Sequence, residues 1–111
     1  MVERSPLLDC VFAALGDPTR RAILARLRKA PATVTEVAQP FDVSLNAVSK
    51  HVKMLERARL VTRKRIGREH RLSLNATPLR GAARWLVDYQ QFWEAGLDRM
   101  EQLLLQRRKR S

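Results

Sequence analysis

The hydrophobic period of this 111-residue chain is helical along most of its length and changes in one place. Up to Arg59, and again from about residue 78, apolar side chains recur at steps of three and four, as in helices that bury one face. Between these parts, Leu60 to Arg65 and Glu69 to Leu74 are β-favouring runs separated by Ile66-Gly67-Arg68. The sequence therefore predicts a mainly α-helical fold with one two-stranded β-hairpin, whose tip is at Gly67.

Capping residues mark the first two helices. The first helix covers about residues 7–15 and ends before Gly16. Asp17-Pro18 starts the second, because Asp17 can accept a hydrogen bond from a free backbone N–H and Pro18 needs no such partner. Ala30-Pro31 ends it. Its arginines are expected on the surface that the apolar stripe leaves free; they are Arg20, Arg21, Arg26 and Arg28.

A short helix and a tight turn precede the fourth helix. Thr33 and Glu36 have the spacing of a capping box. Pro40 is expected to force Gln39 out of helical geometry, so that the short helix lasts about a turn and a half. Ser44 then caps a helix over about residues 45–57, and its inward positions are Val48, Val52 and Leu55.

Thr77-Pro78 repeats the cap-plus-proline start and opens a long last helix, over about residues 78–105. The order is helix, helix, short helix, turn, helix, hairpin, helix. This order is the winged helix-turn-helix pattern, with the hairpin of residues 60–74 as the wing. We expect a single domain over residues 1–111, with helices 7–15 and 78–105 forming a dimer.

The charge of the chain is high and unevenly placed. The net charge is +11, and residues 44–80 hold ten basic and two acidic side chains. A polyanionic partner is indicated, with nucleic acid ahead of a membrane surface. The single cysteine cannot form an internal disulfide, the start of the chain lacks a signal sequence, and no apolar run approaches about 18 residues. We therefore expect a cytoplasmic protein with no membrane partner.

The fourth helix has the division that a DNA-reading helix needs, with one apolar face for its own domain and a polar N-terminal face for the major groove. Asn46 could pair with adenine, Lys50 with guanine or a phosphate, and Ser49 is small enough to permit close approach. The alternative is an ordinary amphipathic surface helix. The outward positions are Leu45, Asn46, Ser49, Lys50 and Lys53.

The wing is strongly basic, and only Glu69 opposes its positive charge. A basic loop with a glycine at its tip suits phosphate contact or insertion into the minor groove. The alternative is a solvated edge hairpin that charge protects from aggregation. The basic residues of the wing are Arg63, Lys64, Arg65, Arg68 and Arg71.

The first and last helices carry broad apolar faces that so small a monomer would struggle to cover. We expect an isologous dimer built from these faces; the alternatives are burial within the chain and a small-ligand pocket. The basic run of residues 107–110 is expected to be a solvated tail. The predicted dimer residues are Leu8, Val11, Phe12, Leu15, Trp85, Tyr89, Phe92, Trp93, Leu97, Met100 and Leu104.

Three segments, LGDPTRRAILARL, TVTEVAQPFDVSLNAVSKHVKMLERARLV and RKRIGREHRLSLN, together resemble the ArsR/SmtB-type bacterial repressors over residues 15–75. The flanking helices fit the dimer elements of that family. The resemblance implies a homodimeric winged-helix repressor that binds a palindromic operator on double-stranded DNA. It also implies DNA contacts along the wing and at Ser44, Leu45, Asn46, Ser49, Lys50, His51 and Lys53.

The chain departs from the metal-sensing members of this family. The helix before the turn has no cysteine, the last helix has no histidine, and Cys10, His51 and His70 are isolated in sequence. We therefore expect no metal and no cofactor, as in the metal-free branch with an aromatic segment like Trp85–Glu94, and the effector stays unknown.

Roles for these three isolated residues follow from their surroundings. His51 could contact phosphate or pack against another helix, and these roles remain open. His70 is expected to pack within the hairpin. Cys10 is expected to be a small core residue, with a thiol sensor as the alternative.

Sequence-specific repression is the function that these features favour. A non-specific architectural DNA protein would need the basic wing but no base-reading face. An enzyme is not expected, because the chain has no phosphate-cradling loop, HExxH or GxSxG motif. A protein-only interaction module would leave the charge of residues 44–80 unexplained.

Overall fold

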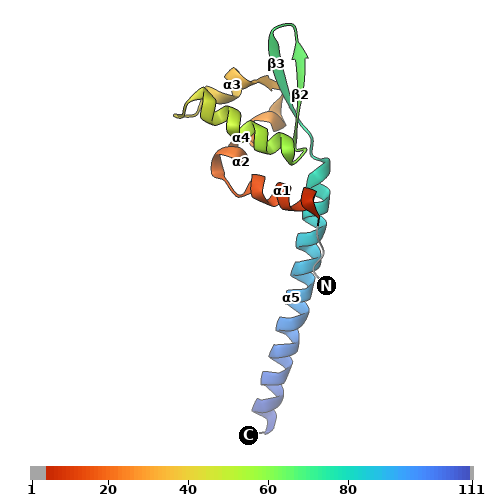
Figure 1. Cartoon of the computed structure of the whole chain (residues 1–111). Helices are drawn as coiled ribbons and strands as arrows, with labels where there is room; N and C mark the ends of the chain where they lie inside the picture. The colour runs from red at the N-terminus through yellow and green to blue at the C-terminus, as the bar shows by residue number, and fades with distance from the viewer. Residues whose placement is uncertain (1–4, 111) are drawn as a thin grey trace.

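A computed structural model describes residues 5–110 of the chain. The elements, in chain order, are α1 (Pro6–Leu15), α2 (Pro18–Lys29), β1 (Ala32–Thr33), α3 (Val34–Ala38), α4 (Leu45–Arg57), β2 (Val61–Ile66), β3 (Glu69–Leu74) and α5 (Thr77–Arg110). Helices α1 to α4 gather beside a small sheet, while the β2–β3 wing and α5 extend in opposite directions (Figure 1). The predicted winged helix-turn-helix architecture is confirmed.

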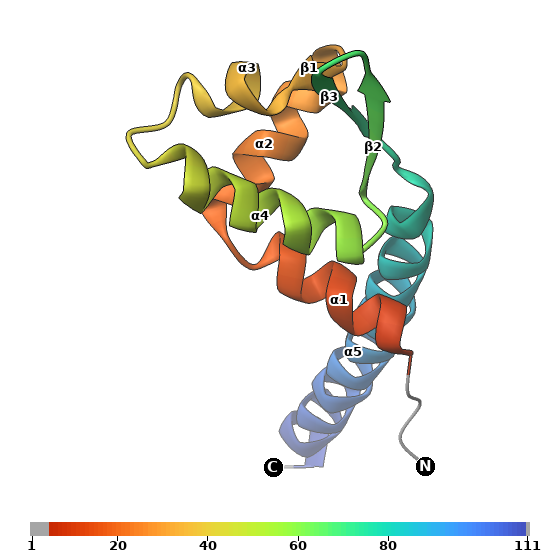
Figure 2. The same cartoon turned by 45° about the horizontal axis from the view of Figure 1, so that its top comes forward.

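The core lies where α1, α2, α4 and the sheet meet. The inward stripe of α4 is confirmed, because Val48, Val52 and Leu55 are fully buried. Ile23 of α2 and Leu72 of β3 are fully buried with them. Figure 2 shows α4 lying between α1 and α3.

The predicted caps are present at α2, α3 and α4. The Asp17 carboxylate accepts from the Arg20 N–H at 3.0 Å, and the Ser44 hydroxyl accepts from the Ala47 N–H at 3.1 Å. Thr33 and Glu36 form the reciprocal capping box. These side chains satisfy backbone donors that have no partner within the first turn.

The geometry expected at Gln39 is wrong. Its backbone is helical, with φ −52° and ψ −46°, although Pro40 follows it. A proline only disfavours the helical region for the residue before it. Here the Gln39 N–H donates to the Thr35 carbonyl at 3.1 Å, and the Phe41 N–H donates to the Ala38 carbonyl at 3.0 Å. These two bonds hold Gln39 in a turn that continues the helix.

The sheet has three strands rather than two, in the antiparallel order β1-β3-β2. The additional strand is β1, in which Ala32 is opposite Leu72 and Thr33 is opposite Arg71. The hairpin turn is also shorter than predicted, since Ile66 belongs to β2 and pairs with Glu69. Only the two residues 67–68 form the turn. Gly67 has φ +63°, as a tight hairpin turn with glycine in its first central position requires.

The α4–β2 connection contains a residue in the left-handed region. Arg59 has φ +58°, which costs energy for any residue with a Cβ. The Arg59 N–H donates to the Glu56 carbonyl at 2.9 Å, and the Leu60 N–H donates to the Leu55 carbonyl at 3.0 Å. This bond pattern closes the end of a helix, and glycine usually occupies the left-handed position.

Helix α5 begins with a different cap from the one predicted. The Asn75 side-chain oxygen accepts from the Thr77 N–H at 3.3 Å, so Asn75 rather than Thr77 serves the first turn. The helix continues to Arg110, beyond the predicted end near residue 105. Its 34 residues span about 50 Å, and Ala82 is the only α5 residue among the described ones that is buried. No helix in the described part of the chain is both long and apolar enough to cross a membrane.

Candidate nucleic-acid interface

Helix α4 presents most of its predicted reading residues to solvent. Leu45, Asn46, Lys50 and Lys53 are exposed, and Ser49 is half-buried beside them. Ser44, the cap of this helix, is also exposed. Because the free N–H groups of a helix start attract anions, this end of α4 combines hydrogen-bond donors with lysine charge. The arrangement can accept a phosphate and place Asn46 against a base edge.

His51 points into the junction between α4 and α2. Its Nδ1 atom lies 3.2 Å from Nη1 of Arg20 and 3.8 Å from Oδ2 of Asp17. The side chain is 26% exposed, so it is half-buried. Of the two roles left open for His51, this placement favours packing against a neighbouring helix.

The Asp17 carboxylate at this junction has a lowered pKa. The Arg20 N–H that donates to it is the main cause. Partial desolvation acts in the opposite direction, and the charge that His51 carries when it is protonated and the charge of Arg20 lower the pKa further. Asp17 is therefore held in its ionised form, which is the form that accepts hydrogen bonds at the start of α2.

The pairing of β2 with β3 divides the basic residues of the wing between two faces. Residues directly opposite each other share a face. Lys64 is opposite Arg71, whereas Arg63 is opposite the buried Leu72. Two positive side chains placed directly across from each other destabilise a hairpin, unless an anion lies between them. The Lys64–Arg71 pair is therefore a position where a phosphate would relieve repulsion.

The other basic residues of the wing differ in their contacts within the protomer. Nη2 of Arg63 lies 2.9 Å from the Glu56 carboxylate of α4, which ties the wing to the reading helix. Nε of Arg65 donates to the Gly67 carbonyl at 3.1 Å, within the wing itself. Arg68 is exposed in the turn.

The packing role predicted for His70 is wrong. Its side chain is exposed opposite Arg65, because the buried part of β3 begins only at Leu72 and the wing extends beyond the body.

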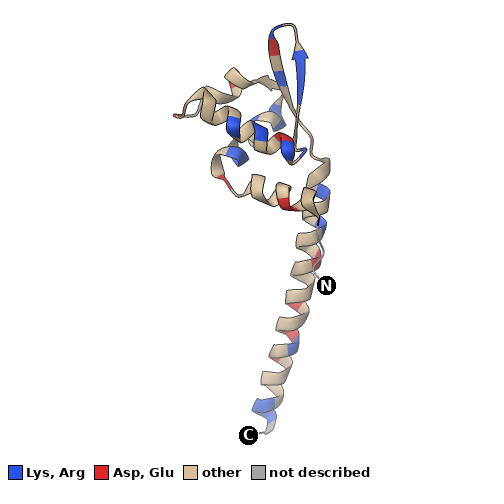
Figure 3. Cartoon of the chain, viewed as in Figure 1, with Lys and Arg blue, Asp and Glu red and all other residues tan. Residues whose placement is uncertain are grey.

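The charge distribution separates two parts of the molecule. Figure 3 shows Lys and Arg on α4 and along the wing, while acidic side chains recur along the middle of α5. Glu56 is the only acidic residue of α4, and Arg63 pairs with it. The surface formed by α4 and the wing is therefore basic.

The apolar face of α5 is largely uncovered in the protomer. Phe92 is 72% exposed and Trp85 is 42% exposed, and their neighbours along the stripe fall between these values. Phe12 of α1 contacts Trp85 edge to face, with ring centroids 5.6 Å apart, and Trp85 stacks on Tyr89 at 5.1 Å. The alternative of burial within the chain is therefore wrong for most of α5.

The predicted dimer residues on α1 are less available than those on α5. Val11 is only 1% exposed and belongs to the core of its own protomer. Leu8, Phe12 and Leu15 are half-buried. The remaining predicted dimer residues are exposed on α5; these are Trp85, Tyr89, Phe92, Trp93, Leu97, Met100 and Leu104.

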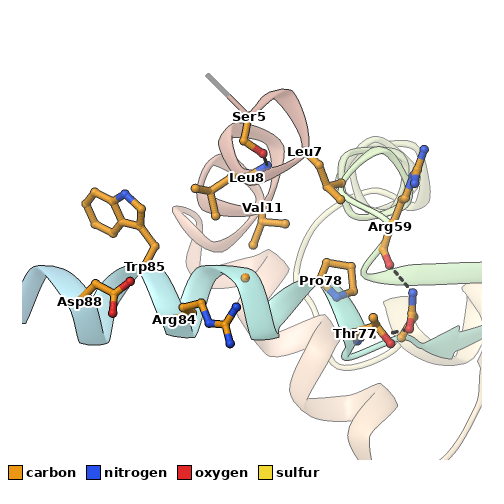
Figure 4. A pocket seen from close by; sticks show the side chains of 12 residues that line it. Ser5, Leu7, Leu8, Val11, Arg59, Thr77, Pro78, Arg84, Trp85 and Asp88 are labelled. Carbon is orange, nitrogen blue, oxygen red and sulfur yellow. Dashed lines mark hydrogen bonds between the residues drawn. The ribbon is translucent and has the colours of Figure 1, made fainter. Parts of the chain in front are cut away.

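A cavity of about 630 Å³ lies between α1 and the first turns of α5 (Figure 4). Leu8 and Val11 of α1 and Trp85 of α5 form apolar parts of its wall. Arg59 and Arg84 add positive charge at its edge. Part of the lining is the same aromatic stripe that is uncovered on α5, so the cavity is continuous with the predicted dimer surface.

The residues considered as metal ligands remain apart. Within residues 5–110, no three His, Cys, Asp or Glu side chains gather in a group that could hold a metal ion. Cys10 is a free thiol, half-buried in α1 beside the core. The packed position predicted for Cys10 agrees with this placement.

Arg20 is the functional candidate that the sequence did not reveal. Its place in the polar part of α2 predicted a solvent-facing side chain, but its guanidinium bonds to α1 and approaches His51. The one available indication is that α1 ends without a basic residue in its last turn. Its last carbonyls therefore need donors from elsewhere.

Comparison with known proteins gives several matches. A family profile described as a helix-turn-helix domain matches residues 15–64. The HTH-type transcriptional regulator Rv2034 of Mycobacterium tuberculosis is 41% identical over 101 residues, which are 91% of this chain and 90% of that protein. The transcriptional repressor SdpR of Bacillus subtilis is 34% identical over 82 residues, which are 74% of this chain and 91% of that protein. The crystal structure of ArsR family transcriptional regulator RHA00566 has a TM-score of 0.77 and 38% identity, and the match covers 85% of this chain and 97% of that one.

Proposed function

Because this chain belongs to the ArsR/SmtB family of helix-turn-helix transcriptional regulators, we propose that it is a homodimeric repressor that binds a palindromic site on double-stranded DNA without a bound metal. The relative SdpR is named a repressor, which supports this direction of regulation. The observation that carries the proposal is the exposed polar face of α4 beside a basic wing.

Sequence reading is assigned to the first two turns of α4. Asn46 and Lys50 are exposed one turn apart on the same face, so both can reach bases in one groove. Leu45 offers an apolar contact to a thymine methyl group, and Ser44 and Lys53 contact the phosphates on either side. His51 lies at the junction of α4 with α2, so it is not assigned a contact with the base edges.

Phosphate binding is assigned to the wing. Lys64 and Arg71 stand opposite each other on the face that turns away from the core, and Arg68 extends from the turn. A hairpin that projects this far beyond the body can follow the backbone into the adjacent minor groove (Figure 1). Arg63 and Arg65 lie on the other face and support the position of the wing.

Dimerisation is assigned to α5 together with Leu8, Phe12 and Leu15 of α1. A contiguous apolar surface of this length on one helix would be exposed to water in a monomer. A second copy offers the same surface, so an isologous pair covers both stripes at once. It also places two reading helices on one side of the assembly, as a palindromic site requires.

The proposal is tested by selecting duplexes from a random-sequence pool with the purified protein and measuring binding by fluorescence anisotropy. We expect an enriched palindrome whose half-sites are about one helical turn, roughly 34 Å, apart. Affinity should fall steeply with salt, with a slope near −0.9 for each phosphate neutralised. A scrambled duplex of the same composition is the matched control. Equal affinity for the scrambled duplex would support an architectural protein and refute the repressor.

A further inference from the structure

One arginine side chain joins the dimer helix α1 to the reading helix α4. Nε of Arg20 donates to the Ala14 carbonyl and Nη2 donates to the Ala13 carbonyl, both at 2.8 Å. The third nitrogen, Nη1, lies 3.2 Å from Nδ1 of His51. All three guanidinium nitrogens are thus engaged where α1, α2 and α4 meet.

The contacts with α1 reach carbonyl groups at the C-terminal end of this helix, of which Ala13 also accepts from the Gly16 N–H at 3.2 Å. The last carbonyls of a helix have no partner within it, and α1 has no basic residue in its last turn. Arg21 adds a further donor, from Nη1 to the Leu15 carbonyl at 2.7 Å. The C-terminal end of α1 is therefore held by side chains of α2.

The contact with α4 has a defined direction. A guanidinium only donates hydrogen bonds, so Nδ1 of His51 accepts and carries no proton in this arrangement. Asp17 is too far from Nδ1 for a hydrogen bond, at 3.8 Å, and accepts from the Arg20 N–H instead. His51 follows Lys50 in the middle of α4, so its position affects the orientation of the reading face.

We propose that Arg20 and His51 are positioning residues, whose hydrogen bond fixes the reading helix relative to the dimer helix α1. The inference rests on the proposed function, because the separation of two reading helices matters only to a dimer on two half-sites. Those half-sites are about one DNA turn apart, roughly 34 Å. A small rotation of α4 in each protomer displaces both reading faces. Loss of the link therefore weakens binding to paired half-sites and leaves binding to one half-site nearly unchanged.

Two substitutions at His51 separate this role from simple helix stability. In H51N the amide oxygen is bonded to Cγ, as Nδ1 is, so it can accept from Arg20. In H51Q the oxygen is one carbon farther out and misses that position. Glutamine is the better helix former of the two, so a purely structural role predicts that H51Q is at least as good as H51N. The proposed hydrogen bond between Arg20 and His51 predicts instead that H51N binds the paired half-sites better than H51Q.

The experiment measures binding of wild-type protein, H51N, H51Q and R20Q by fluorescence anisotropy at one salt concentration. The probes are the duplex that the wild-type protein selects from a random pool, and the same duplex with one half-site scrambled. We expect H51N to stay within about twofold of wild type on both probes. H51Q and R20Q should bind the paired duplex at least about fivefold more weakly and the single half-site within about twofold of wild type. The double variant R20Q/H51Q should lose no more affinity for the paired duplex than either single variant does.

The outcomes are distinct. The inference is overturned if H51Q binds like wild type, if H51N loses as much as H51Q, or if the losses are equal on the two probes. A wild-type protein that enriches no sequence at all contradicts the proposed repressor itself, before any variant is compared.

Discussion

The Arg63 guanidinium lies 2.9 Å from the Glu56 carboxylate, so the first strand of the wing is fastened to the last turn of the reading helix. Both side chains keep less than a third of their surface exposed. The pair links α4 to the wing, and it also neutralises one arginine of the proposed DNA-binding surface.

Replacing Glu56 tests what this neutralisation does. We expect E56Q to bind duplex DNA more tightly, because Arg63 is then free to contact a phosphate. The slope of log affinity against log salt should become steeper by about 0.9, while stability falls by no more than about 1 kcal/mol. R63Q is the matched control, since it breaks the same pair without freeing a cation and should not steepen the slope. An unchanged slope in E56Q would contradict the prediction.

Asn46 and Lys64 are predicted to contribute to binding in different ways. N46A should lower the preference for the selected site by about 1–3 kcal/mol, with little change in affinity for scrambled DNA. K64A should weaken binding to both duplexes by a similar factor and reduce the salt slope by about one. Competition titrations with both duplexes measure the two effects. The assignment of reading to α4 fails if N46A weakens both duplexes equally.

Arg59 is a site where stability can be gained. With φ +58°, its left-handed backbone costs about 1–2 kcal/mol, and a glycine avoids that cost but adds about 0.5–1 kcal/mol of chain entropy. R59G should therefore be more stable by up to about 1 kcal/mol. K53G is the control, because Lys53 is exposed inside α4 and glycine costs about 1 kcal/mol in a helix interior. In denaturant unfolding at a fixed protein concentration, the midpoint should shift in opposite directions for the two variants.

Gly96 is predicted to lie where the two copies of α5 come closest. A Cβ at Gly96 would meet no atom within 4 Å in the protomer, yet glycine inside a helix costs about 1 kcal/mol relative to alanine. It shares a face with Trp93 and Met100, in the exposed stripe. G96L should therefore weaken dimerisation by about 1–3 kcal/mol, as measured by sedimentation equilibrium.

Gly81 provides the comparison for this prediction. It also lies in α5 with open space around its Cβ position, but it precedes the exposed part of the stripe. G81A should leave the dimer intact and stabilise the helix by about 1 kcal/mol. A dimer of G96L as tight as that of the wild type would show that the two helices do not approach at Gly96.

Stability should depend on pH through Asp17. Its pKa is lowered below the usual 3.8 in the folded protein, chiefly by the Arg20 N–H. The folded state then favours the ionised form, so this group stabilises the protein above pH 3.8. The contribution is lost as the pH falls through the lower folded value. The variant D17N keeps a capping oxygen but cannot titrate.

Chemical denaturation of wild type and D17N at a series of pH values checks this prediction. The stability advantage of the wild type should shrink on acidification, with the protein concentration held constant. A difference that stays the same across the series would mean that the Asp17 charge does not contribute.

Local patterns made much of this fold predictable. The stripe of Val48, Val52 and Leu55, the Ser44 cap and the Thr33–Glu36 capping box are read from neighbouring residues, and the structure confirms all of them. Each depends on one helix and its first turn. The exposed face of α4 follows directly, since the outward positions of an amphipathic helix are fixed once its inward positions are known.

The features that sequence did not predict depend on distant partners. Strand β1 has two residues, too few to show an alternating pattern, and it exists because Leu72 and Arg71 lie beside it. The Arg20 side chain finds its acceptor 31 residues away, at His51. A helical pattern says which side of α2 is polar, but not which polar group will face another helix.

Helix α5 contains nearly a third of the residues of the chain, and almost none of its side chains are buried in the protomer. An isolated helix in water gains little stability from its own hydrogen bonds, so under the proposed dimerisation the folding of α5 and the association of two copies are one process. On dilution, the unfolding of α5 and the dissociation of the protein from DNA should occur together. A regulator built in this way responds to its own abundance, because occupancy of its site at low expression rises with the square of the number of molecules in the cell.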